Sequence, residues 1–384
     1  MEAVNAIWTF PAIVLAALLI AWAAECGQFY ISQGLALAVL AWVQTLPEFA
    51  VEAVIAMEAS QDPAKVHLVT ANFTGSLRLF VGLGWPLVYF IAFFCSRQKL
   101  YSKEKGFWSI RMEDQQAIAV VTLLPALFYF LIIYFKGTLA VFDGVVLALI
   151  YFFYLYLLSK LPSESKEGVE ELDFIPRSVM HLKPPLNVLG VFGLFALGAA
   201  ILWFGAHPFL DSMLALALSL GVSQFVFVQW LAPFLSEFPE QLSAYRWAAS
   251  VTKAPMALAN FVSSSINQWT VLVATVPFIY SFGRGAWSVI VFDDHQKVEI
   301  LLTIVQSYLG FLFLWSMDFS FPEALGLFGL WFVQFVVPGV REEITWVYAG
   351  WALVETARLV KDRHRENAFS VLKKLSREYF FKRA

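Results

Sequence analysis

Apolar runs of about 20 residues recur along this chain, and they restrict its fold more than any other feature. A helix of that length crosses the hydrocarbon core of a bilayer. Hydrophobic residues make up 60% of the 384 residues and charged residues only 14%, whereas soluble domains carry roughly 25% charged residues. The sequence therefore predicts an integral membrane protein with an all-α polytopic fold.

The apolar runs predict eleven spans. In the first half they lie at residues 7–22, 31–57, 66–95, 117–134 and 139–158. In the second half they lie at residues 186–204, 210–247, 255–280, 298–315 and 324–337, and an eleventh at 344–359 has no partner in the first half. The third run is too long for one straight crossing and contains Gly75, Gly82, Gly84 and Pro86. We therefore expect a broken or tilted helix there.

The polar stretches divide the chain. Residues 160–185 are hydrophilic and predict a linker, either a solvated connector or one with a short amphipathic helix. The basic tail carries apolar residues near helical spacing, so it is either an interfacial helix or solvated. The predicted units are a first five-helix repeat (1–159), a cytoplasmic linker (160–185), a second five-helix repeat (186–338), an extra transmembrane helix (339–359) and a basic cytoplasmic tail (360–384).

Carboxylates follow a proline inside two of these apolar runs. They are Glu48, after Pro47, and Glu240, after Pro239. A charged carboxylate inside a span costs roughly 2.5–3.5 kcal/mol, which marks a functional site. Proline removes a backbone donor and leaves carbonyl oxygens unpaired. We expect such carbonyls near Ala41 and Pro233, where oxygen ligands suit a hard cation such as Ca²⁺ or Na⁺.

A second phrase follows each Pro-Glu pair in the same order. It reads Ala-Asn-Phe-Thr-Gly-Ser at residues 71–76 and Ala-Asn-Phe-Val-Ser-Ser at residues 259–264. An internal repeat with interrupted helices at matching positions indicates a transporter's binding site. Because each half has five spans, the halves enter the membrane from opposite sides, which predicts inverted repeats.

These segments resemble the alpha repeats of the cation/calcium exchanger superfamily, which includes sodium/calcium exchangers and calcium/proton antiporters. Their motif is roughly Gly-Thr-Ser-x-Pro-Glu and then Gly-Asn-x-x-Gly-Ser-Asn. The resemblance implies a secondary antiporter that exchanges calcium or a related cation for sodium or protons by alternating access, and that binds the metal ion through Glu48 and Glu240. The further cation-binding residues that we expect are Gln44, Thr45, Ser76, Ser236, Glu237, Ser264 and Gln268, with Pro47, Pro239, Asn72 and Asn260 as motif residues.

Two carboxylates held together repel each other, so they share a proton or bind a cation. A divalent ion neutralises both, and two protons or two monovalent ions replace it at equal charge. The two carboxylates therefore hold either the divalent ion or the ions that replace it, and this mutual exclusion is the physical basis of exchange. No cofactor is predicted.

The sequence departs from the family motif at several positions. Leu77 and Ser265 replace the asparagine after Gly-Ser, and Phe80 stands at the position of Gln268. Arg78 is a cation inside the third span and needs a partner. We expect Arg78 to compensate charge by pairing with Glu237.

The alternatives for Arg78 are snorkelling or pairing with Glu48, which would occupy the site. If Arg78 occupies the site, we expect an alternative function in place of exchange. The chain would then be a non-transporting or altered-ion protein of the same fold that acts as a sensor or membrane-complex subunit. Glu52 lies one turn beyond Glu48 on the same face, and Glu58 lies near the end of that run. These two either form an access path for cations or face water.

Basic residues predict the orientation. With the N-terminus outside and eleven alternating spans, the basic residues of the polar loops and of the tail fall inside, and the C-terminus is inside. Only Lys65, Lys136, Arg284, Lys297 and Arg341 fall outside. We expect the plasma (inner) membrane of a prokaryote, with cations and the lipid bilayer as partners. The oligomeric state stays open.

Other functional classes lack support in the sequence. A net charge of −3 argues against a nucleic-acid partner. The scattered histidines and two cysteines match no zinc spacing. No His-Glu-x-x-His or Gly-x-Ser-x-Gly motif is present, so we do not expect an enzyme.

Overall fold

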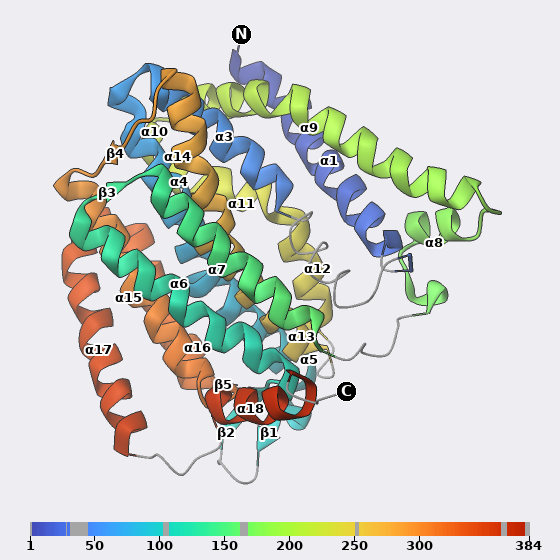
Figure 1. Ribbon diagram of the computed structural model, residues 1–384, viewed down its shortest axis with the longest axis vertical. Helices are drawn as coiled ribbons and strands as arrows, with labels where there is room; N and C mark the ends of the chain where they lie inside the picture. Colours follow the sequence, from blue (N-terminus) through green and yellow to red (C-terminus); the bar gives the residue numbers. More distant parts are fainter. Residues whose placement is uncertain are drawn as a thin grey trace.

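The computed structural model describes residues 2–27, 29–30, 45–102, 107–161, 168–249, 253–361 and 367–380. Figure 1 shows a bundle of long helices. Helices α1 (Ala6–Gly27) and α9 (Leu186–Ser219) lie together at one side of the bundle, and α17 (Arg341–Lys361) lies at the opposite side. Six helices in the described ranges are long and apolar enough to cross a membrane. The helical membrane fold predicted from the apolar runs is therefore present. The number of eleven membrane spans stays a prediction.

The remaining elements of the first half follow α1 in order. They are α3 (Leu46–Gln61), η2 (Pro63–Lys65), α4 (Val66–Leu79), η3 (Phe80–Gly84), α5 (Trp85–Leu100), β1 (Tyr101–Ser102), β2 (Phe107–Arg111), η4 (Asp114–Gln116), α6 (Ala117–Lys136), β3 (Thr138–Leu139) and α7 (Val141–Ser159); η1 (Glu2–Asn5) precedes α1. Residues 31–44, which hold the start of the predicted second span, lie outside the described ranges.

The second half and the tail add the following elements. They are η5 (Val169–Glu171), α8 (Phe174–Met180), α9, α10 (Gln224–Val226), η6 (Phe227–Leu231), α11 (Ala232–Ser236), α12 (Phe238–Ala248), α13 (Ala254–Asn267), η7 (Gln268–Leu272), α14 (Val273–Arg284), β4 (Ile290–Val291), α15 (Asp294–Leu314), β5 (Asp318–Ser320), α16 (Phe321–Val336), η8 (Pro338–Val340), α17, α18 (Ala368–Leu375) and η9 (Ser376–Phe380).

The long third span bends through a π-helix rather than breaking. The π-helix η3 joins α4 to α5, and the π-helix η7 joins α13 to α14 in the second half. Each begins eight residues after the asparagine of the repeated phrase, Asn72 or Asn260. Single π turns within α-helices are frequent at functional sites. The two halves thus share a backbone irregularity at the same place in the repeat.

The predicted boundary between the sixth and seventh spans was wrong. Helix α9 continues for 34 residues with Pro208 inside it, so residues 210–219 belong to the sixth span. The helix ends before Gly221, whose φ of +76° is easily adopted only without a side chain. Ser223 then caps the next helix, because its Oγ accepts a hydrogen bond from the Val226 amide at 3.3 Å. The seventh span therefore begins at Gln224.

Short strands join the halves in a symmetric pattern that an all-α prediction did not include. Strand β2 follows the third span of the first half and pairs antiparallel with β5, which precedes the fifth span of the second half. Strand β4 follows the third span of the second half and pairs with β3, which precedes the fifth span of the first. Figure 1 shows the two pairs at opposite ends of the bundle. Equivalent loops at opposite ends are what inverted repeats require.

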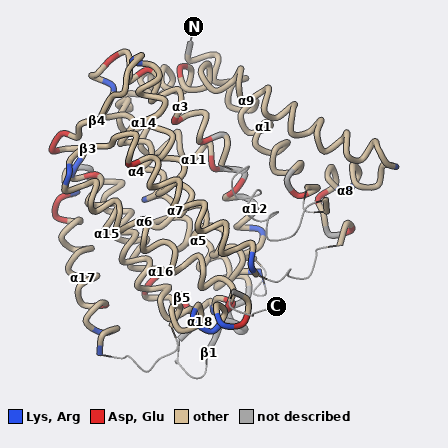
Figure 2. The backbone as a smooth tube through the Cα atoms, viewed as in Figure 1, with Lys and Arg blue, Asp and Glu red and all other residues tan. Residues whose placement is uncertain are grey.

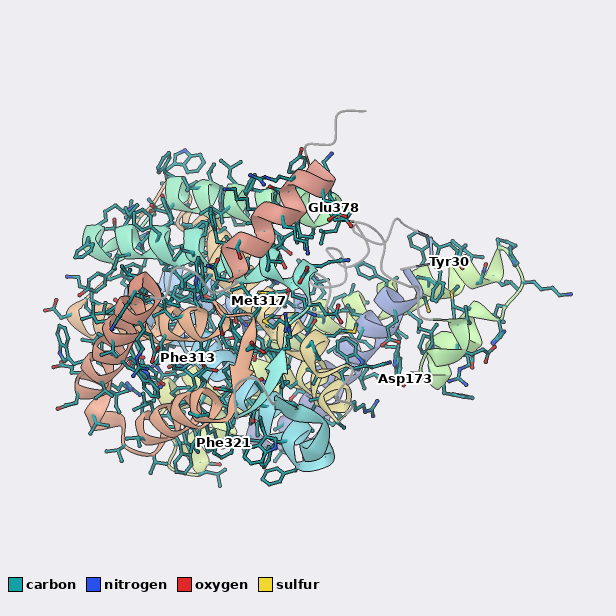
Figure 3. The ribbon with its side chains drawn as sticks, turned by 90° about the horizontal axis from the view of Figure 1, so that it is seen from below. Tyr30, Asp173, Phe313, Met317, Phe321 and Glu378 are labelled. Carbon is teal, nitrogen blue, oxygen red and sulfur yellow. The ribbon has the colours of Figure 1, made fainter. Side chains whose placement is uncertain are left out.

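The linker and the tail both contain short helices. In the linker, whose residues 162–167 lie outside the described ranges, α8 packs on α1, and the Cys26 thiol lies 3.6 Å from the Pro176 carbonyl. The tail helix α18 packs on α6, and the Ala368 amide donates to the Trp315 carbonyl at 2.8 Å. Figure 3 views this end and places Tyr30 and Asp173 well away from Met317 in the main bundle. The described part of the tail is thus helical and docks on the protein.

Candidate cation site

The carboxylates of the Pro-Glu motifs lie at helix N-termini. Glu48 is in the first turn of α3 and Glu240 is in the first turn of α12. In the seventh span, α11 ends at Ser236 and α12 begins at Phe238, so Glu237 occupies the break itself. Because the N-terminus of a helix carries partial positive charge, the start of α3 favours an anionic Glu48, and the start of α12 favours anionic Glu237 and Glu240.

Glu48 and Glu237 are joined by two shared donors. The Ser76 hydroxyl on α4 donates to Glu48 Oε1 at 2.8 Å and also contacts Glu237 Oε1. Gln268 Nε2 at the start of η7 donates to Glu48 Oε2 at 2.9 Å and to Glu237 Oε1 at 3.0 Å. Gln268 Oε1 is buried without a hydrogen-bond partner. One carboxylate from each half therefore converges on a point where a free amide oxygen is also present.

Glu240 lies one turn beyond Glu237 and has its own donors. It accepts a hydrogen bond from Asn260 Nδ2 at 3.0 Å and contacts the Ser264 hydroxyl, both on α13. The carboxylates bridged by common donors are thus Glu48 and Glu237, with Glu240 as their neighbour, rather than Glu48 and Glu240 face to face.

Glu52 is a further buried carboxylate that the predicted set of site residues did not include. It is fully buried and contacts Asn72 Nδ2 on α4. It therefore does not face water. Glu58, nearer the end of α3, is 26% exposed and pairs with Lys65 at 2.9 Å.

The remaining predicted residues have mixed placements. Thr45 is buried and its hydroxyl contacts Asn267 Nδ2 rather than a carboxylate. The Ser236 hydroxyl donates to the Pro233 carbonyl at 3.1 Å, and the same carbonyl accepts from the Glu237 amide at 2.9 Å. The Pro233 carbonyl is therefore not unpaired. Gln44 and Ala41 lie outside the described residues.

The predicted partner of Arg78 was wrong. Its guanidinium contacts Glu299 on α15 and donates to Gln334 Oε1 at 3.2 Å and to the Thr74 carbonyl at 3.1 Å. Since Arg78 follows Ser76 by two residues on α4, its side chain leaves the helix toward a different neighbour than Ser76 does. Arg78 therefore binds neither Glu237 nor Glu48.

Glu299 holds two arginines in a second buried cluster. Arg341 of α17 lies 2.7 Å from Glu299 Oε1, and Gln229 of η6 donates to Glu299 Oε2 at 2.7 Å. Arg341 also donates to Gln229 Oε1 at 2.8 Å. The sequence predicts Arg341 in an outer loop, whereas the structure buries it at the start of α17. The signal that could have found this cluster was Glu299, a carboxylate at the start of an apolar run.

The site has a large excess of negative charge. Glu48, Glu52, Glu237 and Glu240 are all at most 5% exposed. Within the described residues, no Lys, Arg or His side chain pairs with any of the four. Buried carboxylates without a counter-charge are stable only when protonated or bound to a cation. The arrangement can therefore bind protons or cations in alternation.

Comparison with known proteins shows a common family and fold. The profile of the family described as sodium/calcium exchanger protein matches residues 3–160 and 190–339. A crystal structure of the H⁺/Ca²⁺ exchanger CAX is 30% identical, with a TM-score of 0.87 over 98% of this chain and 91% of that one. A structure of the sodium-calcium exchanger NCX_Mj, soaked with 2.5 mM Na⁺ and 0.1 mM Ca²⁺, is 18% identical, with a TM-score of 0.57 over 88% of this chain and 98% of that one. A search of curated proteins found no match.

Proposed function

This chain belongs to the sodium/calcium exchanger protein family, and we propose that it moves Ca²⁺ across a membrane in exchange for protons by alternating access. It is an integral membrane protein of a transporter family, with inverted repeats. The observation that carries the proposal is the convergence of Glu48 and Glu237 on Ser76 and Gln268, with Glu240 beside them. Ca²⁺ prefers such carboxylate, amide and hydroxyl oxygens.

Protons are favoured over sodium as the counter-ion for two reasons. The similarity to the H⁺/Ca²⁺ exchanger covers nearly the whole chain at 30% identity, whereas the similarity to NCX_Mj, at 18%, concerns the fold. In addition, the four buried carboxylates, which pair with no basic side chain in the described part of the chain, require protons whenever no metal ion is bound. Two protons replace one Ca²⁺ at equal charge.

The membrane arrangement that we propose has eleven spans, with the N-terminus outside and the C-terminus inside, in the plasma membrane of a prokaryote. Figure 2 shows basic positions around α18, at the end of the bundle that carries β1. The positive-inside tendency assigns that end to the cytoplasm.

A non-transporting role has less support than the exchange of ions. Such a role requires that Arg78 occupies the cation site. Arg78 is instead held by Glu299 and Gln334, which leaves Glu48 and Glu237 available to a cation.

The test is uptake of radioactive calcium by proteoliposomes that contain the full-length protein. We expect uptake when the lumen is acidic and none when an outward sodium gradient replaces the proton gradient. Glu48→Gln and Glu237→Gln should each abolish uptake. Ser265→Ala is the matched control, because the Ser265 hydroxyl bonds to the Phe261 carbonyl of its own helix at 2.8 Å. Uptake driven by sodium alone would refute proton exchange, and no uptake under either gradient would refute transport of calcium.

A further inference from the structure

Glu52 and Asn72 form an isolated acid–amide pair between α3 and α4. Both side chains are at most 1% exposed. Asn72 Nδ2 contacts Glu52 Oε2, and the other two oxygens of the pair, Glu52 Oε1 and Asn72 Oδ1, are buried without hydrogen-bond partners. An unpaired buried polar atom costs about 1–3 kcal/mol. The pair as it stands therefore lacks one hydrogen.

A proton on Glu52 supplies that hydrogen. A protonated carboxyl has one O–H donor, and a carboxamide has one acceptor and two N–H donors. With the proton on Glu52 Oε1, the acid donates to Asn72 Oδ1 while the amide donates to Glu52 Oε2. This reciprocal pairing satisfies both orphaned oxygens at once, whereas an ionised Glu52 leaves both without a donor.

Within the described residues, no hydrogen bond or ion pair joins Glu52 to a Lys, Arg or His side chain. On α3 itself the acidic neighbours are Glu48, one turn before Glu52, and Glu58. The undescribed residues 31–44 contain no charged residue. The other titratable groups on described helices packed against α3 are Glu25, Cys26, Lys65, His67, Arg78, His207, Asp211, Tyr280 and Arg284.

The second half contains the same pair at the same spacing. Glu52 and Asn72 are 20 residues apart, and so are Glu240 and Asn260. In the second half the acid also contacts Ser264, and it belongs to the cation site. The first half instead carries two acids one turn apart, Glu48 with the bridging donors and Glu52 with the asparagine. In the first half, the contacts with the serine and with the asparagine are thus divided between Glu48 and Glu52, whereas Glu240 makes both contacts in the second half.

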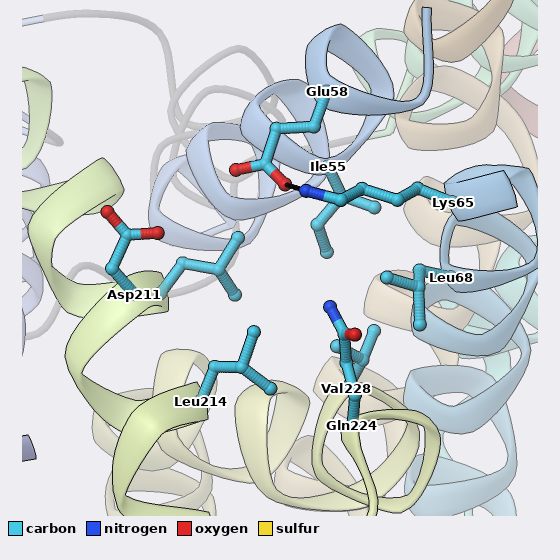
Figure 4. A pocket seen from close by; sticks show the side chains of 9 residues that line it. Ile55, Glu58, Lys65, Leu68, Asp211, Leu214, Gln224 and Val228 are labelled. Carbon is cyan, nitrogen blue, oxygen red and sulfur yellow. Dashed lines mark hydrogen bonds and ion pairs between the residues drawn. The ribbon is translucent and has the colours of Figure 1, made fainter. Parts of the chain in front are cut away.

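A cavity lies beyond Glu52 along the same helix. It has a volume of about 70 Å³ and is lined by Ile55, one turn from Glu52, and by Glu58, Lys65 and Asp211. Figure 4 shows Glu58 between Lys65 and Asp211 at the edge of this cavity. The cavity and its polar groups therefore lie toward the Glu58 end of α3 from Glu52.

We propose that Glu52 and Asn72 form a proton-binding site that carries one proton of each exchange cycle. Glu52 holds the proton while the cation site is empty. It releases that proton to the cavity when Ca²⁺ binds one turn away, because the divalent ion favours an ionised carboxylate nearby. It takes up one proton when Ca²⁺ leaves, so each cycle restores the starting state. This proposal rests on calcium/proton exchange as the function.

The test counts the protons released when Ca²⁺ binds to purified full-length protein in weakly buffered solution. We expect Glu52→Gln to bind Ca²⁺ but to release one proton fewer per ion than the wild type. The variant should fold, because a glutamine amide can pair reciprocally with Asn72. Glu355→Gln is the control, because Glu355 pairs with Arg358 at 2.7 Å on α17, and it should release as many protons as the wild type.

Infrared difference spectra on Ca²⁺ addition provide a second readout that does not depend on transport. The wild type should lose a protonated-carboxyl band that Glu52→Gln lacks. Glu52→Asp keeps the acid but withdraws it from Asn72, so this band should shift in frequency.

Two outcomes overturn the proposal, namely an unchanged proton count and carboxyl band in Glu52→Gln, or loss of Ca²⁺ binding in that variant while its thermal stability is retained. Should Glu52→Gln fail to fold, an unshifted band in Glu52→Asp overturns it. If the wild type binds and transports no Ca²⁺, the proposed function itself fails instead.

Discussion

Gly75 lies where α4 of the first half packs closely on η6 of the second half, and replacing it with alanine is a sharp test of this geometry. Gly75 precedes Ser76 on α4 and packs against the backbone of η6, which leads through α11 to Glu237. A Cβ atom at Gly75 would lie 1.8 Å from the Gln229 carbonyl oxygen, 2.6 Å from its carbonyl carbon and 2.9 Å from its Cα. All three are backbone atoms, which cannot rotate away.

Two effects of opposite sign decide the outcome. Alanine is about 1 kcal/mol more favourable than glycine inside a helix. Against this, relief of the clash requires α4 and η6 to separate by about 1.6 Å, since ordinary contact begins at 3.4 Å. Overpacking costs about 1–3 kcal/mol even where side chains can adjust. Because only backbone can adjust here, we expect a net destabilisation of about 2 kcal/mol or more.

The separation should also weaken Ca²⁺ binding. It draws Ser76 away from Glu237, so the hydroxyl can no longer bridge the two carboxylates. The assays are thermal unfolding in detergent and calorimetric titration with Ca²⁺, in which we expect at least roughly tenfold weaker binding, or about 1.4 kcal/mol.

Gly84→Ala is the matched control for this substitution. The nearest atoms that its Cβ would meet belong to the Phe261 ring, at 3.5 Å or more, which is ordinary contact. The control should therefore stay within about 1 kcal/mol of the wild type. A Gly75→Ala protein as stable as Gly84→Ala, with unchanged Ca²⁺ affinity, would show that the halves are not packed as described.

Three further predictions concern the two buried clusters. Glu299→Gln leaves two buried guanidinium groups without a counter-charge and should lower the free energy of unfolding by about 3–5 kcal/mol. Arg341→Gln leaves Glu299 paired with Arg78 and should lower it less. Unfolding in detergent compares the two variants, and a less stable Arg341→Gln protein would contradict the pairing. Ser76→Ala removes a hydroxyl from two carboxylates and should weaken Ca²⁺ binding roughly tenfold by calorimetry, while Ser265→Ala should not. The Ca²⁺ affinity should fall as the pH falls, because protons and the metal ion compete for the same oxygens. The expected decrease is up to roughly tenfold per pH unit for each proton displaced. An affinity that does not change between neutral and acidic pH would contradict the exchange of Ca²⁺ for protons.

Much of the fold followed from sequence patterns alone. The apolar runs predict the membrane helices because only a helix satisfies its backbone hydrogen bonds within lipid. The repeated phrases with Asn72 and Asn260 predict the matched halves, and the two π-helices begin at the same distance from each. The sixth helix was predicted too short because the apolar run was divided after residue 204, whereas in the fold the helix continues through Pro208 to Ser219.

The candidate site was predicted in kind but not in its contacts. The sequence identified carboxylates in apolar segments because burying a charge is costly wherever the segment folds. It did not determine their partners, because a partner depends on which helix lies opposite. Arg78 and Glu237 are both charges in need of compensation, yet Arg78 contacts Glu299, which is 221 residues away in the chain.

By itself, therefore, the sequence determined that this protein is a helical membrane protein with two related halves and buried acids, because these properties depend on residue type and spacing. Only the tertiary structure decided that Glu48 shares its donors with Glu237, that Arg78 belongs to a separate cluster, and that Glu52 pairs with Asn72. These pairings depend on the distances and orientations between helices, which the packing of the whole bundle sets.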